Sequence, residues 1–316
     1  HTPQDHAAEQ HADSAHRHGA HATIERTVDV AVVGGSAAGL AAALQLARQR
    51  RSVVVIDSGE PRNAPAAHMH SYLGHEGRPP ADFLRIAREE VRSYGVEVLR
   101  GCVTDVTRDE TGLRAALTGG HVVRARRVVA ATGQVDELPD VPGLADHWGG
   151  AVIHCPFCHG YEARDGRIVA LVTSPMGLHP LPLLRQLTAD LTVLIHAGVD
   201  TDEPQLQTLR DAGVTVVVQP AAAVVSDAAG GLRGIRLSDG SEIAADTILA
   251  SNSSSYASRL MIDEVEHPVA RLHHHVVGTL QHRVQRIRLF TQGHPHGGCP
   301  VHILICRRAD GQRRCR

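Results

Sequence analysis

The chain has 316 residues, 42% of them hydrophobic, and a formal net charge of −2 at pH 7. This length suggests two domains, and the apolar content is enough to build their cores. The near-neutral charge argues against nucleic acid as a partner. The absence of any run of about 18 apolar residues predicts no membrane span.

Residues 1–26 combine many histidines with small polar residues. This composition is typical of a disordered tail, and we expect that state rather than a metal site. The tail resembles neither a secretory signal nor a transit peptide. We therefore expect a cytoplasmic protein, where a disulfide is more often catalytic than structural.

A βαβ unit follows the tail. Residues 28–33 and 52–57 are predicted strands, and residues 37–50 are a predicted helix. The first strand leads into a small-residue turn made of Gly34, Gly35, Ser36, Ala37, Ala38 and Gly39. Pyrophosphate would lie on the helix N-terminus, and Asp57 would bind ribose hydroxyls. Ser36 replaces a fingerprint glycine but is small enough to permit close approach. The sequence therefore predicts nucleotide binding.

Residues 59–65 form a turn-rich loop, in which Arg62 could neutralise a phosphate. Asn63 or His68 could hydrogen-bond a ring or a ribityl chain, although His68 and His70 could equally be surface positions. A helix is predicted over 81–94 and a strand over 96–99. A β-meander then runs from residue 102 to 129, with Cys102 expected to be buried.

The meander ends at a second small-residue turn of Ala131, Thr132 and Gly133. Such a turn lets the backbone approach a bound nucleotide closely. Residues 136–150 are punctuated by proline and glycine, and this is the best candidate for a domain boundary.

Cys155 and Cys158 have the spacing of a redox pair on the first turn of a helix. Unpaired N–H groups at a helix start favour the reactive thiolate. His159 could carry a proton to or from that thiolate. The alternatives are half a zinc site or two buried cysteines. A CxxC pair near βαβ patterns favours redox chemistry.

A second βαβ-like unit comprises strands over 167–172 and 191–195 with a helix over 176–187. Its turn lacks the glycine fingerprint, and two prolines fall inside the expected helix, where proline is costly. The second strand ends without an acid or an arginine pair. This pattern favours the absence of NADPH binding. A helix over 204–213 and strands over 214–218, 222–225, 232–237 and 242–248 are also predicted.

The pattern changes again at about residue 252, where histidine and arginine become frequent. Cys299, Cys306 and Cys315 lie in this segment but lack the paired spacing of closed zinc sites, so no metal site is predicted. We expect this segment to be divergent or read out of frame.

The order GGSAAG (34–39), Asp57, ATG (131–133) and CPFC (155–158) resembles the low-molecular-weight thioredoxin reductase family of FAD-dependent disulfide oxidoreductases. The resemblance covers residues 27–250. It implies an α/β fold with two Rossmann-like three-layer domains. The FAD domain would comprise residues 27–146 and 246–316, interrupted by a central CxxC domain over 147–245.

The resemblance also implies bound FAD and a homodimer. The family closes its FAD domain with a Gly-Asp pair, which this chain lacks, so the C-terminal part is atypical or missing. Cys158 would face the flavin, and Cys155 would exchange with the substrate. The residues expected at FAD are Gly34, Gly35, Ser36, Ala37, Ala38, Gly39, Asp57, Ser58, Arg62, Asn63, His68, Val103, Ala131, Thr132 and Gly133.

Within the family, CPFCHGYE is similar to dithiol oxidases of disulfide-containing natural products. True reductases typically place Asp where this chain has His159, and the oxidases dispense with NADPH. This likeness implies that a small dithiol is oxidised at Cys155, that electrons pass through Cys158 to FAD and oxygen, and that His159 is the base.

Three other functions remain open. The chain could be an NADPH-dependent reductase of thioredoxin-like proteins. It could instead be an inactive or regulatory nucleotide-binding protein with an incomplete flavin site, or a His-rich metal-binding protein.

Overall fold

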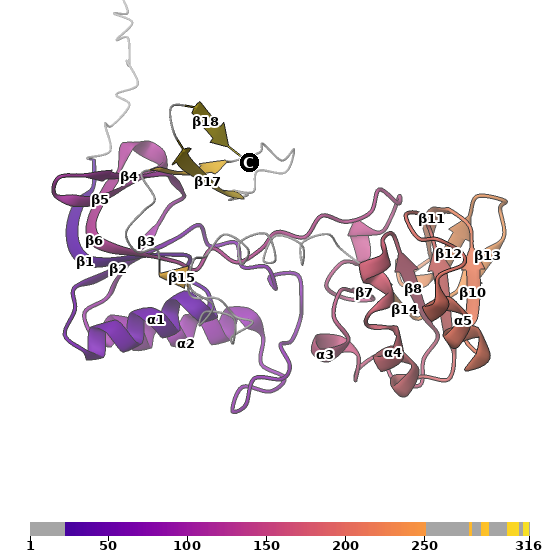
Figure 1. The fold of residues 1–316 in the computed structure, drawn as a ribbon. Helices are drawn as coiled ribbons and strands as arrows, with labels where there is room; N and C mark the ends of the chain where they lie inside the picture. Colours follow the sequence, from indigo (N-terminus) through magenta and orange to yellow (C-terminus); the bar gives the residue numbers. More distant parts are fainter. Residues whose placement is uncertain (1–22, 251–277, 280–285, 291–301, 310–311, 316) are drawn as a thin grey trace, which may run out of the picture.

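The computed structural model describes residues 23–250 and, as backbone strands, 278–279, 286–290, 302–309 and 312–315. Figure 1 shows two units side by side, each built on a sheet. The predicted α/β fold with Rossmann-like parallel sheets is confirmed. No helix in the described part of the chain is both long and apolar enough to cross a membrane.

The first unit begins with β1 (Glu25–Val33), α1 (Ala37–Arg48), β2 (Val53–Asp57), α2 (Pro80–Ser93) and β3 (Glu97–Arg100). The three strands are parallel, and β1 lies between β2 and the later strand β6 (Val122–Ala130). Alternate residues of β1 serve two cores. Val30 and Val32 pack with α1 and α2, whereas Ala31 and Val33 pack on the opposite face, as the period of a pleated strand requires.

The predicted meander consists of β4 (Val103–Asp109), β5 (Gly112–Leu117), a 3-10 turn (Thr118–Gly120) and β6, and it continues the same sheet beyond β1. Residues of β4 and β5 pack in the core on the opposite face. Cys102 is buried, as predicted. The remaining strands are β15 (Gly278–Thr279), β16 (Arg286–Phe290), β17 (His302–Ala309) and β18 (Gln312–Cys315). Because β15 pairs with β6 and β16 pairs with β4, the chain returns to the first sheet after the central unit.

The central unit contains a parallel sheet in the order β10-β9-β8-β14-β7. Its strands are β7 (Val152–Ile153), β8 (Ile168–Val172), β9 (Leu191–Ile195), β10 (Thr215–Val218) and β14 (Thr247–Ala250). Its helices are the 3-10 turns Ala145–His147 and Pro175–Leu178, with α3 (Pro156–His159), α4 (Leu181–Leu187) and α5 (Pro204–Asp211). An antiparallel sheet of β11 (Ala221–Ser226), β12 (Leu232–Leu237) and β13 (Glu242–Ala244) completes the unit.

The faces of this parallel sheet again have separate cores. Ile168, Ala170 and Val172 pack with residues of α4 and α5. Val169 and Leu171 pack with residues of the antiparallel sheet. Two-sided burial explains why β8 is apolar at every position, as expected of a central parallel strand.

Two predicted boundaries in the first unit were wrong. Strand β1 begins at Glu25 rather than at residue 28, and Arg26 pairs with Glu97 at 2.8 Å. Residues 25 and 26 therefore belong to the sheet and not to the tail. Helix α1 ends at Arg48 because Arg50 has φ +59°, a left-handed conformation that a helix cannot continue through.

The helix predicted over 176–187 is shorter than expected. A 3-10 turn occupies Pro175–Leu178, and α4 begins only at Leu181. Pro180 is the N-cap of α4, and Pro182 lies in its first turn. Proline is tolerated at both positions because the N–H groups of a first turn have no partner within the helix.

The single strand predicted over 242–248 was also wrong. The structure divides it into β13 and β14, which lie in different sheets. Ala245 is buried between them, and Asp246 pairs with Arg167 beside the start of β8. Because β14 pairs with β8 and β7, the central sheet continues to Ala250, past the predicted boundary at residue 245. Residues 1–22 of the predicted tail and most of the divergent segment lie outside the described residues.

Candidate functional site

The glycine-rich turn at the end of β1 is closely packed against the 131–133 turn. Gly34 has φ +106°, and its N–H donates to the Ile56 carbonyl at 2.8 Å. A Cβ on Gly34 would lie 2.0 Å from the Ala131 carbonyl oxygen, and one on Gly39 would lie 1.8 Å from the Gly34 carbonyl oxygen. These positions require glycine because no side chain fits. The sequence motifs GGSAAG and ATG therefore meet at the start of α1.

Asp57 lies at the carboxyl end of β2, beside this turn. Its Oδ1 accepts hydrogen bonds from the Gly35 N–H at 3.3 Å and the Gly59 N–H at 3.2 Å, while Oδ2 accepts from Arg88 at 2.8 Å. The carboxylate thus fixes the turn. Its predicted contact with ribose stays a prediction.

The remaining predicted cofactor residues surround the same region or lie beside it. Ser36 precedes α1, Ala37 and Ala38 are its first residues, and Ser58 follows β2. Gly133 has φ +71° with open space around it. Val103 is buried in the core at the start of β4. A tight glycine turn at a helix start followed by an acid fits the dinucleotide that the sequence predicts.

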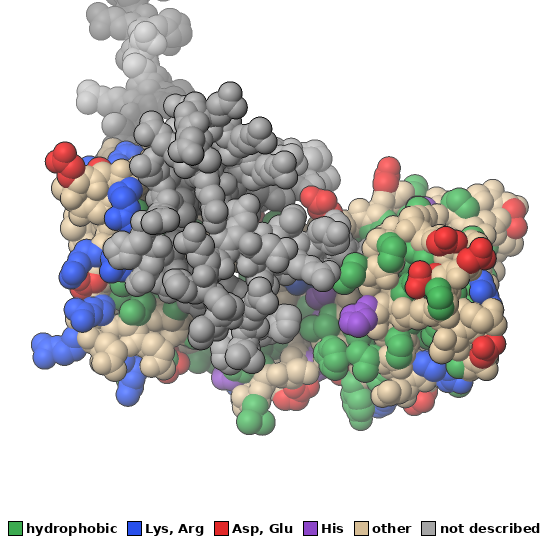
Figure 2. Space-filling model, viewed as in Figure 1, with side chains coloured by type: hydrophobic (Ala, Val, Ile, Leu, Met, Phe, Trp, Pro, Cys, Tyr) green, Lys and Arg blue, Asp and Glu red, His purple; other side chains and the backbone are tan. Residues whose placement is uncertain are grey.

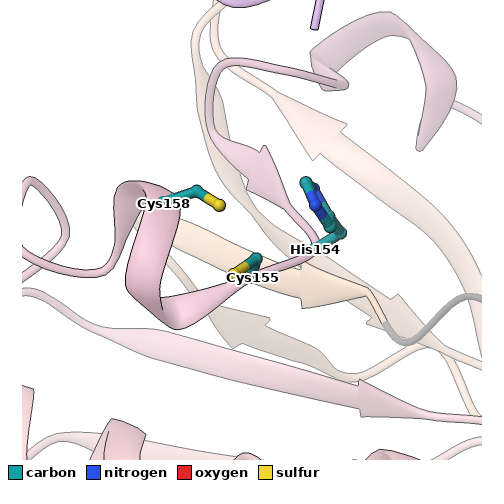
Figure 3. A group of neighbouring side chains, drawn as sticks. All are labelled: His154, Cys155 and Cys158. Atoms are coloured by element: carbon teal, nitrogen blue, oxygen red, sulfur yellow. The ribbon is translucent and has the colours of Figure 1, made fainter. Parts of the chain in front are cut away.

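Cys155 and Cys158 lie on the first turn of α3, as predicted. Cys155 is the N-cap, with φ −140° and ψ 120°, and Pro156 opens the helix. Both cysteines are free thiols and are half-buried. Figure 3 shows their sulfur atoms beside the ring of His154, the residue that follows β7.

The two thiols differ in acidity. A hydrogen bond from the Cys158 thiol, supported by backbone groups of residues 157 and 158, lowers the pKa of Cys155 to about 6. The same hydrogen bond, together with burial, raises the pKa of Cys158. Near neutral pH, Cys155 is therefore the thiolate and Cys158 the proton donor. A thiolate is the nucleophilic form of cysteine.

Both histidines next to the pair are neutral near pH 7. Burial, with a contribution from the Arg62 charge, lowers the pKa of His154 to about 4. Burial and the neighbouring His70 lower the pKa of His159. A neutral imidazole can accept a proton or bind a metal ion.

A cavity of about 270 Å³ joins the two units. Ser36, Arg62 and Asn63 line it from the first unit, and Cys158, His154 and His159 line it from the central unit. Cys155 does not line this cavity. The arrangement thus brings three of the predicted cofactor residues together with one cysteine of the pair.

Arg62 and Asp136 form an ion pair within the cavity lining. The Arg62 Nε donates to Asp136 Oδ2 at 2.8 Å, and the Asp136 side chain is only 6% exposed. The predicted phosphate contact of Arg62 remains a prediction. The positive charge of Arg62 also lowers the pKa of Cys155, and it is the smallest of the contributions to that shift.

A loop of the first unit contacts the CxxC segment directly. The Ser71 hydroxyl donates to the Phe157 carbonyl at 3.1 Å, and the His70 ring meets the His159 ring edge-on at 5.9 Å. Glu76 accepts a hydrogen bond from His70 at 2.7 Å. Purple histidine side chains show near this junction in Figure 2. His68 is exposed, and its backbone hydrogen-bonds His159.

Sequence reasoning missed three residues of this site. His154 lies beside the cysteine pair, since one of its ring nitrogens and both sulfurs lie within 4.8 Å of one another. Trp148 packs against that ring at 5.8 Å, and Asp136 holds Arg62. The position of His154 between β7 and Cys155 was a usable signal. The other two had none.

Comparison with known proteins gives the family. Residues 28–255 match the pyridine nucleotide-disulphide oxidoreductase family. Thioredoxin reductase sirT of Leptosphaeria maculans is 30% identical, and the match covers 70% of this chain and 72% of that protein. Thioredoxin reductase tcpT of Claviceps purpurea (strain 20.1) is 37% identical over 48% of each chain, so this chain spans about half of that relative.

A solved structure described as HlmI is 41% identical and covers 72% of each chain with a TM-score of 0.69. The chain therefore belongs to the pyridine nucleotide-disulphide oxidoreductase family. Its relatives within that family include thioredoxin reductases, which confirms the resemblance drawn from the motifs. Members of the family typically bind FAD.

Proposed function

We propose that the chain is an FAD-dependent dithiol oxidase that converts a small dithiol to its disulfide. The observation that carries this proposal is the shared cavity: Cys158 and the nucleotide-side residues Ser36 and Asn63 line one space. FAD, when bound at the glycine turn, supplies a two-electron acceptor that passes electrons to oxygen.

The CxxC pair performs the sulfur chemistry. Starting from the disulfide form, a substrate thiolate attacks the sulfur of Cys155 and displaces Cys158 as a thiolate. The second thiol of the substrate then attacks the substrate sulfur that is bound to Cys155. This step releases Cys155 as a thiolate and the substrate as its disulfide. Two electrons and two protons are left on the enzyme side. The low pKa of Cys155 makes it a good leaving group in the second step.

The histidines would move the protons. His159 is neutral near pH 7, and its Nδ1 has no hydrogen-bond partner among the described residues. His70 and Glu76 connect its ring towards the exposed loop. We assign His159 the role of base and His70 that of a positioning residue.

Apolar exposed side chains flank the reactive cysteine. Phe157 is 71% exposed and Tyr161 is 66% exposed, and both lie within the CPFCHGYE segment. An apolar substrate that covered these two rings would bury aromatic surface, and this burial would favour binding. This favours a small apolar dithiol as the substrate.

The second βαβ unit supports the oxidase over the NADPH-dependent reductase. A four-residue 3-10 turn follows β8, and α4 begins three residues after it ends. Pro180 is the N-cap of α4, and Pro182 lies in its first turn. Pro175, Pro180 and Pro182 cannot donate N–H groups to a pyrophosphate. At the end of β9, His196 already accepts a hydrogen bond from the Ala221 N–H at 2.9 Å.

Oxygen uptake by the FAD-loaded chain tests the proposal. A small dithiol without NADPH should consume oxygen and yield its disulfide, and Cys158→Ser should abolish turnover while flavin stays bound. NADPH consumption with oxidised thioredoxin would instead establish the reductase named in the relatives. Protein that stays colourless after refolding with excess FAD would favour an inactive nucleotide-binding protein.

A further inference from the structure

Three metal-binding side chains converge beside the redox pair. A ring nitrogen of His154 and the sulfurs of Cys155 and Cys158 all lie within 4.8 Å of one another. Within the part of the chain that the structure describes, no other group of three His, Cys, Asp or Glu side chains meets this spacing. Figure 3 shows the three residues on consecutive segments, at the end of β7 and on α3.

The donor set has a definite preference. Two thiolates and one imidazole are ligands for Zn²⁺ and other soft or borderline cations, whereas Mg²⁺ and Ca²⁺ prefer oxygen. Tetrahedral zinc with these ligands needs donor separations of about 3.5–3.8 Å. Because the three donor atoms lie within 4.8 Å of one another, even a pair at that limit needs to approach by only about 1 Å. Three protein ligands leave a fourth coordination position open.

The three ligands are already held near one another. Cys155 and Cys158 are fixed by the single turn of α3, whose Gly160 N–H donates to the Pro156 carbonyl at 2.9 Å. The His154 ring rests against Trp148, with 5.8 Å between ring centroids. His154 and Cys158 both line the cavity between the units, which gives a cation a path to the group.

We propose that the reduced cysteine pair and His154 form an inhibitory binding site for a single Zn²⁺ ion. Binding replaces the protons of the thiols with the metal, and these protons go to solvent. No electrons move. Metal-bound sulfurs can neither form the Cys155–Cys158 disulfide nor attack another disulfide, so binding inhibits the cysteine pair. Because only thiolates bind the metal, the site exists only in the reduced state. The proposal goes beyond the oxidase function, and binding is measured without turnover.

Zinc titration of the purified, reduced and chelator-treated full chain tests the proposal, with a colorimetric zinc chelator as competitor. The reduced chain should bind one more Zn²⁺ than the same chain oxidised to the Cys155–Cys158 disulfide. His154→Phe keeps a ring against Trp148 but cannot bind metal, and it should weaken binding by about ten-fold or more. His154→Ala provides a second variant, and circular dichroism checks that both are folded.

The matched control is His179→Ala, which removes an exposed histidine of the same unit, two residues before α4. It should bind zinc like the unmodified chain. Equal zinc affinity in His154→Phe and the unmodified chain would overturn the proposal, because the cysteines alone would then account for binding. Absence of stoichiometric binding to the reduced chain, or equal binding to the oxidised chain, would also overturn it.

Discussion

Cys155 and Cys158 are three residues apart but chemically unlike. The hydrogen bond between them places the negative charge on Cys155 and leaves the proton on Cys158. Cys158 lines the cavity towards the nucleotide turn, whereas Cys155 does not. This asymmetry supports the division of labour implied by the family resemblance, with Cys155 exchanging with substrate.

The asymmetry predicts the pH dependence of alkylation. The pKa of Cys155 is lowered to about 6, so its thiolate forms as the pH rises through about 6. An unperturbed thiol becomes reactive only near its ordinary pKa of about 8.5. In reduced, chelator-treated Cys158→Ala protein the hydrogen-bond donor is removed, and the alkylation midpoint of Cys155 should move to higher pH. Iodoacetamide labelling read by mass spectrometry checks this, and an unchanged midpoint would contradict the assigned cause.

Gly34 carries a second prediction at the scale of one residue. In Gly34→Ala the new Cβ meets the Ala131 carbonyl at 2.0 Å, in addition to the left-handed strain of about 1–2 kcal/mol. Gly74→Ala is the matched control, since it shares a positive φ of +85° but has no atom within 4 Å. We expect Gly34→Ala to lose flavin and to unfold at lower urea than Gly74→Ala. Equal flavin content in the two variants would contradict the assignment of the Gly34 turn to flavin binding.

Elements built from periodic apolar residues could be predicted well. Strands β2, β8 and β9 and helix α2 lie within one residue of their predicted ends. Their predictability follows from two-sided burial or an amphipathic face. The break between β13 and β14 could not be predicted, because no glycine or proline separates them in the sequence and only tertiary pairing sends them to different sheets.

The candidate site was predictable in a similar, partial way. Motifs local in sequence, such as the glycine turn and Cys155–Cys158, were found where expected. The contacts between Arg62 and Asp136 and between His70 and His159 join residues 74 and 89 positions apart, since 136 − 62 = 74 and 159 − 70 = 89. No periodicity signals such pairs.

The β13–β14 break makes a testable prediction. Asp246 follows β13 and accepts hydrogen bonds from Arg167, which lower the pKa of Asp246 to about 2. A lowered carboxyl pKa stabilises the fold above its unfolded-state pKa of about 3.9, and that contribution is lost as pH falls through about 2. Both side chains are about half exposed, so Asp246→Asn should cost less than about 1 kcal/mol.

Urea unfolding at pH 7 and at pH 2.5 measures this contribution. The stability difference between Asp246→Asn and the unmodified chain should be present at pH 7 and smaller at pH 2.5. Asp202→Asn is the control, because Asp202 is an exposed carboxylate of the same unit. A difference that grows towards pH 2.5 would contradict the sign of this argument.

At the scale of the whole molecule, two α/β units each contribute half of one site. The first provides the glycine turn and the loop that carries Arg62 and His70, and the central unit provides the cysteine pair. Figure 1 shows α3 on the side of the central unit that faces the first unit. The chemistry therefore depends on the contact between units rather than on either alone.

Electron transfer from the cysteine pair to flavin is the central claim, and anaerobic absorption spectroscopy tests it most directly. The FAD-loaded chain is mixed with a small dithiol, and flavin absorbance is followed in the unmodified chain and in Cys158→Ser. We predict bleaching in the unmodified chain and none in the variant, with NADPH bleaching neither. If the dithiol bleached the flavin of Cys158→Ser as fully as that of the unmodified chain, the account would be contradicted.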